Sequence, residues 1–145
     1  MTQSGGFTVA AEHPNIALMS RLDLRDLAGC ADLFAQGFIW HFVNPKLPEI
    51  QGDYYGVAGL GTFFQRMSRQ TGGTFSAQLV SAIPFGDEFV VTHVRDTMKL
   101  DGAPMMVDAV VVWRIVDSRI AEAWDIPAIN TAKALPVADA AAKKR

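Results

Sequence analysis

The sequence is short of cysteine, of surplus positive charge and of long apolar runs, and each shortage excludes a class of protein. Cys30 is the only cysteine in 145 residues, so no internal disulfide and no cysteine-based metal site can form. The formal net charge of −2 argues against a nucleic-acid partner, because phosphate binding needs clustered Lys and Arg. No apolar run approaches the roughly 18 residues of a membrane helix, and residues 1–7 lack the basic and apolar regions of a signal peptide. We therefore expect a soluble, cytoplasmic protein that binds neither nucleic acid nor a membrane.

The two ends of the chain differ in composition from the middle. Residues 1–12 are small and polar, and residues 129–145 are rich in Ala and Lys, so both are expected to be flexible tails. No repeat or linker-like stretch interrupts the segment between them. The sequence therefore predicts a single domain over residues 13–128, of the size that compact domains usually have.

Three helices are predicted in the first half of this domain. The first would open at 13–15 (HPN), because Pro in the first turn loses no needed N–H group. Asp26 would cap a second, short helix that stops at Gly37. Residues 57–69 return to helical spacing, although two glycines weaken this helix by about 1 kcal/mol each relative to Ala. We therefore expect packing to hold the third helix.

Strand-like segments fill the rest of the domain. Residues 38–43 (FIWHFV) are aromatic and β-branched and predict a first strand. Four more strands are expected at 74–83, 88–100, 105–116 and 119–127. The turns between these four are short, so consecutive strands should be antiparallel neighbours. Helices followed by such a meander indicate an α+β fold, in which three N-terminal helices pack on a curved, mainly antiparallel sheet.

Five stretches follow one another in a spacing that few folds would reproduce. They are 26–41 (DLAGCADLFAQGFIWH), 52–56 (GDYYG), 63–64 (FF), 71–75 (TGGTF) and 110–124 (VVVWRIVDSRIAEAW). Together they resemble the helix-then-strand opening, loop, third helix, first long strand and closing hairpin of SnoaL-like proteins, within the nuclear transport factor 2 superfamily. The resemblance covers about residues 14–128. It implies a cone-shaped barrel with a pocket between sheet and helices, often paired into dimers through the outer sheet face.

Asp125, near the end of the last strand, is the leading candidate for chemistry. The resemblance places it where limonene-type epoxide hydrolases keep one of two catalytic aspartates, and near the acid/base of SnoaL-like cyclases. Strand alternation puts Asp125 on one face with Ala123, and Trp124 on the other. A carboxyl group among small and apolar neighbours is desolvated, which raises its pKa toward the range useful for proton transfer. The alternative is an exposed carboxylate, or one paired with Arg95 or Arg114.

Asp96 is the expected partner of Asp125. A gapless alignment with the epoxide hydrolases puts Asp96 on their other aspartate but Val94 on their arginine, and Arg95 lies one position away. A one-residue slip turns a strand side chain to the opposite face. His93 and Arg95 alternate with Asp96, so either they line the pocket or Asp96 does. If both carboxyls share a pocket, one should hold its proton and the other should not.

The expected pocket lining is apolar. Trp40 and Phe42 should point inward and His41 outward. By the resemblance, Trp40 and Phe42 replace a tyrosine and an asparagine that hold the attacking water in epoxide hydrolases. The catalytic base of ketosteroid isomerases falls on Phe42, and their other two groups fall near Leu18 and Val111, so the isomerase groups are all lost. The residues expected to bind substrate are Trp40, Phe42, Phe63, Met67 and Val111.

Two functional hypotheses follow for a pocket that takes a small apolar organic ligand. The first is a cofactor-free isomerase, cyclase or epoxide-hydrolase-like enzyme, with Asp125 as general acid/base, assisted by Asp96 or by His93 and Arg95. The second is a ligand-binding or dimerisation module without catalysis. The three histidines lie far apart without ligand spacing, so no metal site and no cofactor is predicted. An outward Trp124 would expose a large aromatic side chain in a monomer, which predicts a homodimer through the outer sheet face.

Overall fold

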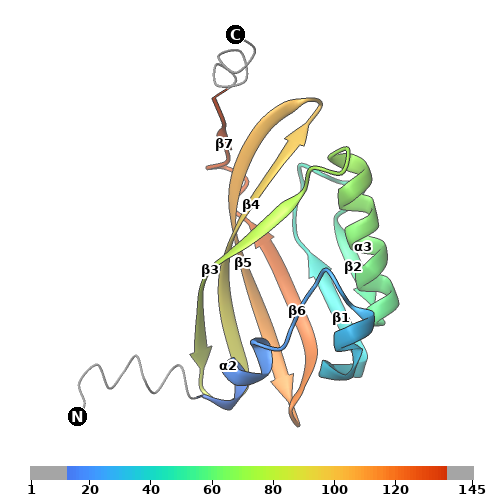
Figure 1. Ribbon diagram of the computed structural model, residues 1–145, viewed down its shortest axis with the longest axis vertical. Helices are drawn as coiled ribbons and strands as arrows, with labels where there is room; N and C mark the ends of the chain where they lie inside the picture. Colours follow the sequence, from blue (N-terminus) through green and yellow to red (C-terminus); the bar gives the residue numbers. More distant parts are fainter. Residues whose placement is uncertain (1–12, 137–145) are drawn as a thin grey trace, which may run out of the picture.

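The fold is built on one curved, seven-stranded sheet (Figure 1). The computed structural model describes residues 13–136. The expected tail at 1–12, and the part of the expected C-terminal tail at 137–145, lie outside the described residues. The elements are α2 (Pro14–Met19), the 3-10 helix η1 (Ala28–Leu33), β1 (Phe34–Phe42), β2 (Gly52–Tyr55), α3 (Gly56–Gln70), β3 (Ser76–Phe85), β4 (Phe89–Leu100), β5 (Ala103–Val116), β6 (Arg119–Pro127) and β7 (Lys133–Ala134).

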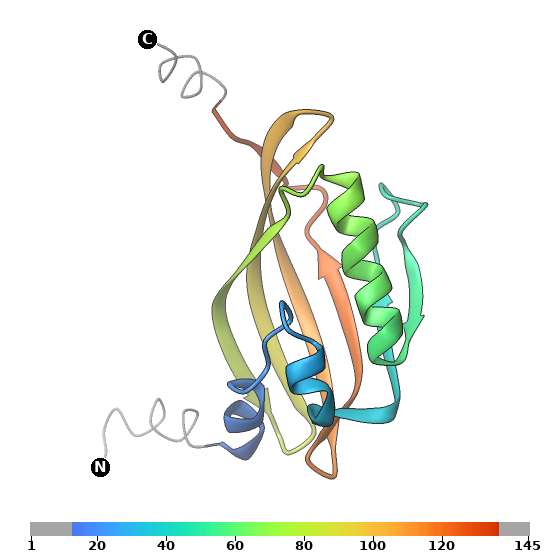
Figure 2. The ribbon, with the colours of Figure 1, turned by 45° about the vertical axis from the view of Figure 1, so that its right-hand side comes forward.

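The order of the strands confirms the predicted meander, but it does not form the expected closed barrel. The sheet runs β2-β1-β6-β5-β4-β3, and β7 pairs with β5. Each of β3 to β6 pairs antiparallel with the next, as the short turns predict. β1 pairs with β6 in parallel, so the sheet is mixed. Because β2 and β3 form opposite edges, the sheet stays open and the expected cone-shaped barrel is not closed (Figure 2).

Three covering helices were expected, but within residues 13–136 only α3 is longer than six residues. The second predicted helix is found only as the 3-10 helix η1, and its expected end at Gly37 is wrong, because β1 already begins at Phe34 and continues through Gly37. Phe34 pairs with Ile120 of β6 and packs edge-on against Phe38, with ring centroids 4.8 Å apart. This packing overrides the local helix signals, and Gly37 lies where the β1–β6 register shifts.

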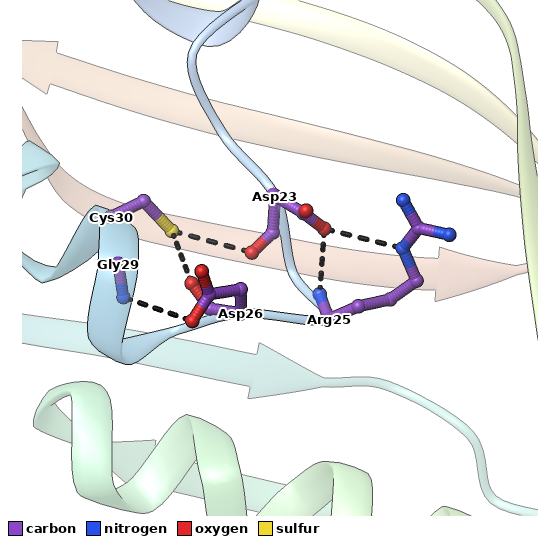
Figure 3. A network of polar contacts seen from close by, with 5 residues as sticks. All are labelled: Asp23, Arg25, Asp26, Gly29 and Cys30. Atoms are coloured by element: carbon purple, nitrogen blue, oxygen red, sulfur yellow. Dashed lines mark hydrogen bonds and ion pairs between the residues drawn. The ribbon is translucent and has the colours of Figure 1, made fainter.

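The turn before η1 keeps the capping role expected of Asp26 (Figure 3). Its Oδ1 accepts a hydrogen bond from the Gly29 N–H at 3.1 Å. Asp23 Oδ1 accepts from the backbone N–H and from Nε of Arg25, at 3.0 and 3.3 Å. The Cys30 thiol lies 3.3 Å from the carbonyl oxygens of both Asp23 and Asp26, to either of which it can donate. Cys30 is therefore a buried structural residue.

Helix α3 covers the concave face of the sheet beside β1 and β2 (Figure 2). Leu60, Phe63 and Met67 form its buried stripe. Gly59 allows a close approach to β2, because a Cβ atom there would lie 2.9 Å from the carbonyl carbon of Tyr54. Packing against the sheet therefore holds a helix that its own propensity would weaken. No helix in the described part of the chain has the length and hydropathy to cross a bilayer.

The described chain continues past the expected boundary at residue 128. β7 pairs with β5 at Met105 and Met106, and the Leu135 N–H donates to the Pro104 carbonyl at 3.0 Å. The segment between β6 and β7 thus returns along the end of the β4–β5 hairpin (Figure 1). It contributes one wall of the cavity described next.

Candidate functional site

A cavity of about 180 Å³ lies between the concave face of the sheet and the second half of α3. Its size is close to that of an apolar cavity of about 150 Å³ that accepts benzene. Most of the lining is apolar and includes Phe42, Phe63, Phe75, Met67, Met98 and Met105. The polar lining residues are Asn44, Lys46, Asp96 and Asp125. The cavity therefore suits a small, largely apolar molecule with few polar contacts.

Asp125 is brought into this cavity by the register of β6. It lies between Phe42 of β1 and Val111 of β5. Its side chain faces inward with that of Ala123, while Trp124 faces outward, which agrees with the predicted alternation. Asp125 is 8% exposed, and its carboxyl group has no hydrogen-bond partner within residues 13–136. The exposed or arginine-paired alternative is therefore excluded.

Asp96 reaches the same cavity from β4, where it pairs with Ala77 of β3 and Val107 of β5. It is 7% exposed and likewise makes no side-chain hydrogen bond to any described residue. The two carboxyls thus share a pocket, as the alignment suggested. By contrast, Thr92, buried on the same face, is bonded to the protein: its hydroxyl accepts from Trp113 Nε1 at 3.0 Å.

The cavity raises the pKa of both acids. Burial raises the pKa of Asp96 from 3.8 to about 7, and the negative charge of Asp108 adds to the rise. Burial also raises the pKa of Asp125 well above its ordinary value, and the charge of Asp96 raises it further. Because ionisation of Asp96 favours the protonated form of Asp125, the pair can offer one proton donor and one carboxylate.

His93 and Arg95 do not reach the cavity, which corrects their assignment as candidate catalytic residues. Both lie on the outer face of β4, because Asp96 takes the inward position. His93 Nε2 lies 2.8 Å from Asp108 Oδ1, and Arg95 Nε donates to the same oxygen at 3.1 Å. The hydrogen bond from His93, opposed by burial and supported by Arg95, lowers the pKa of Asp108. The expected pairing of Asp108 with an arginine is thus observed, and no arginine lines the cavity.

The five residues expected to bind substrate divide into two groups. Phe42, Phe63 and Met67 line the cavity. Trp40 and Val111 also face inward and are buried, but they are not part of its lining. Trp40 is covered by α3, since its ring centroid lies 5.4 Å from that of Phe63. Its Nε1 is a buried side-chain donor without a partner in the described part of the chain.

The loop after β1 supplies lining residues that sequence reasoning missed. Asn44 Oδ1 accepts from the Lys46 N–H at 3.0 Å, which forms the turn announced by the Asn-Pro pair. Lys46 Nζ then donates to the Ile129 carbonyl at 3.1 Å, joining this loop to the segment after β6. The turn could be predicted from the sequence. The meeting of two loops 83 positions apart in the chain could not.

The outer face of the sheet carries a second polar cluster. His41 points outward as predicted, and its two ring nitrogens lie 2.7 Å from Asp53 Oδ1 and from Glu122 Oε2. Burial lowers the pKa of His41, but these two hydrogen bonds outweigh it and hold the pKa above 6.5. Trp124 lies between the His41 ring, stacked at 5.3 Å, and the Arg114 guanidinium at 5.5 Å. The indole expected to be exposed is therefore half covered by its own chain.

No group of three or more His, Cys, Asp or Glu side chains within residues 13–136 is placed to hold a metal ion. The candidate site therefore consists of two unpartnered acids in an apolar cavity. The carboxyl groups of the two acids can donate or accept a proton. The apolar side chains of the lining can exclude water and match the shape of a ligand.

Comparison with known proteins agrees with this architecture. The family model described as a SnoaL-like domain matches residues 16–123. Bal32a, from a soil-derived mobile gene cassette, superposes with a TM-score of 0.64 at 23% identity, over 83% of this chain and 88% of that one. TerC, co-crystallised with polyporic acid, gives 0.65 at 22% identity, over 78% and 90%. A putative polyketide cyclase from Bacillus cereus ATCC 10987 gives 0.61 at 15% identity, over 81% and 76%.

No curated protein matches the sequence significantly. The structural relatives are each less than 25% identical to this chain, so they show the fold alone. The family model, in contrast, spans most of the described residues. The chain belongs to the family of SnoaL-like domains.

Proposed function

We propose that this protein binds a small, largely apolar organic molecule and rearranges or cyclises it by proton transfer, with Asp125 as general acid/base and no cofactor. The observation that carries the proposal is the pair Asp96 and Asp125, each more than nine-tenths buried and without a protein partner, in one apolar cavity. Such surroundings raise the pKa of a carboxyl group, so that it can hold a proton and give it to a substrate oxygen. The co-crystal of TerC with polyporic acid and the putative polyketide cyclase support a small organic ligand.

The proposed roles follow from the burial of both acids and from the effect of the Asp96 charge on Asp125. Asp125 gives its proton to the reacting molecule and takes it back, or does so in the reverse order. Asp96, with a pKa of about 7, can ionise near neutral pH and then carries the negative charge of the pair during proton transfer. The low dielectric of the cavity strengthens both interactions relative to water. Epoxide opening is less well supported, because Arg95 lies on the outer face and cannot complete an Asp-Arg-Asp set.

The second candidate is a ligand-binding module without catalysis. It is favoured by two apolar residues of β1: Phe42 stands where related enzymes hold a base or a water ligand, and Trp40 is sealed under α3. In such a module Asp125 would serve binding or structure only.

The first test is a carbon-detected NMR titration of the Asp carboxyls, assigned with Asp96→Asn and Asp125→Asn. We expect the Asp96 midpoint near 7, an Asp125 midpoint well above about 3.9, and a shift of each when the other is neutralised. Asp101→Asn is the matched control, because Asp101 lies in the exposed β4–β5 turn with φ of 52°, which Asn tolerates. Ordinary midpoints for both acids would refute an acid–base site.

Once a substrate is found by screening, Asp125→Asn separates the two candidates. An enzyme loses turnover while it keeps its fold and ligand affinity. A binding module shows no selective loss of this kind. Asp101→Asn should leave turnover and affinity unchanged.

We also propose a homodimer through the outer sheet face. Val110 and Ile126 are paired neighbours on β5 and β6 of that face, and they are 37% and 40% exposed. Ile83 on β3, 53% exposed, belongs to the neighbouring row of the same face, which the strand register continues through Val91 and Val112 to Trp124. Sedimentation at micromolar concentration should show a dimer that Ile126→Lys dissociates. A monomeric wild type would contradict the proposal.

A further inference from the structure

The two cavity carboxyls have no positive partner in the described structure. Asp96 and Asp125 make neither an ion pair nor a side-chain hydrogen bond there, although they are 7% and 8% exposed. Arg95, adjacent to Asp96 in sequence, is bound on the outer face. Lys46 is the one basic residue of the lining, and its ammonium group donates to the Ile129 carbonyl at the loop contact. Burying a carboxylate is unfavourable unless a cation or a hydrogen-bond donor contacts it. The cavity therefore lacks a positively charged or donor group for its two acids.

We propose that the ligand supplies this component: it is a small hydrophobic amine or similar organic cation, whose charged nitrogen lies against Asp96 and Asp125. This inference rests on the proposed function and names the class of molecule that the same cavity takes. The walls fit such a cation, because Phe42, Phe63 and Phe75 offer aromatic faces and the three lining methionines offer polarisable sulfur. A single ring with a short ammonium arm matches a cavity of about 180 Å³.

The division of labour between the acids follows from the charged groups around them. Asp96 is faced by Asp125 from β6 and by Asp108 from the outer side of β5, and α3 presents only apolar side chains to the cavity. Lys46 is the remaining charge, at the loop after β1. Asp96 therefore pairs with the ammonium group as a carboxylate, and Asp125, whose pKa is raised by burial and by the charge of Asp96, supplies the proton for transfer. Where Asp96 is protonated before binding, its proton leaves to solvent when the cation enters.

Three probes of the same shape test the charge preference: benzylamine, benzyl alcohol and benzoate, which are cationic, neutral and anionic near neutral pH. Binding is followed by NMR of methyl-labelled methionine, because Met67, Met98 and Met105 line the cavity and Met19 does not. We expect benzylamine to bind at least about tenfold more tightly than benzyl alcohol at pH 8, as a hydrogen-bonded charge pair exceeds a neutral one. Benzoate should bind most weakly.

The pH dependence gives a reading that needs no variant. Benzylamine affinity should fall by up to about tenfold for each pH unit below 7, because a proton must then leave Asp96. Benzyl alcohol affinity should stay nearly constant over the same range. Asp96→Asn should abolish the preference for the amine and change the affinity for the alcohol by no more than about twofold, whereas Asp101→Asn should preserve it.

Several results would overturn the inference. They are equal or tighter binding of benzyl alcohol, tightest binding of benzoate, no binding of any probe at millimolar concentration, or an amine preference that survives in a folded Asp96→Asn variant. Tight binding of benzyl alcohol together with raised titration midpoints of the carboxyls would refute the cationic ligand and leave the proposed acid–base function intact. Ordinary carboxyl midpoints would remove the proposed function itself.

Discussion

Replacement of Asp96 by Asn should make the protein more stable at alkaline pH and leave the two proteins closest in stability under acidic conditions. In the folded state Asp96 is 7% exposed, and burial raises its pKa from 3.8 to about 7. At about 1.4 kcal/mol per pKa unit, this rise corresponds to about 4 kcal/mol as an upper limit. The carboxyl group therefore opposes folding wherever it must ionise inside the cavity.

The sign follows from the protons bound in each state. Below 3.8 both the folded and the unfolded chain hold the Asp96 proton, so pH has no effect through this group. Between 3.8 and about 7 only the folded chain holds it, and the free energy of unfolding falls as pH rises. Above about 7 the full loss is in place. Asn does not titrate, so its advantage over Asp should grow through this window.

Urea denaturation of wild type and Asp96→Asn at pH 4, 5, 6, 7 and 8 measures this difference, and the subtraction cancels other titrating groups. The amide can carry a constant cost of its own, so the slope with pH is the decisive quantity. Neutralising Asp96 also lowers the pKa of Asp125, which acts in the same direction. A difference that stays flat from pH 4 to 8, or that shrinks, would refute a desolvated Asp96.

Two further predictions concern helix α3 and the outer face. Gly59→Ala should lower the free energy of unfolding in urea, because its Cβ would lie 2.9 Å from the Tyr54 carbonyl carbon. Gly61→Ala should raise the free energy of unfolding by about 1 kcal/mol, because its Cβ would lie 3.9 Å from Leu27 Cδ1 and Ala favours a helix over Gly. Equal effects of the two substitutions would contradict the packing account. Because the folded-state pKa of His41 is raised, its ion pairs stabilise the protein fully below 6.5 and less as pH rises through that value. His41→Gln should therefore lose more stability at pH 6 than at pH 9 in the same assay, and a pH-independent loss would contradict this.

Much of the architecture could be predicted from residues that act locally. The short turns between β3, β4, β5 and β6 set the meander, and strand alternation placed Asp125 inward and Trp124 outward. The second helix ends at Leu33, before the predicted Gly37, because Phe34 is needed in the core against Phe38 and beside Ile120, and no local pattern predicts that contact. Strand β7 was not predicted for a similar reason. Its two residues pair with a distant hairpin, and so short a strand shows no periodic pattern in the sequence.

The candidate site could be predicted only up to one binary choice on β4. His93 and Arg95 lie on one face of β4 and Asp96 lies on the other. The sequence left open which of these two faces would line the cavity. The hairpin register settles the choice: it pairs Arg95 with Asp108, which offers the cation a carboxylate on the outer face, and so turns Asp96 into the cavity without a counter-charge. A shift of one residue would have turned Asp96 outward and Arg95 inward, and the guanidinium beside Asp125 would then favour the ionised form of that acid. The same hydrogen-bond register that builds the sheet therefore decides which charged side chains enter the cavity, and so raises the pKa of both acids there.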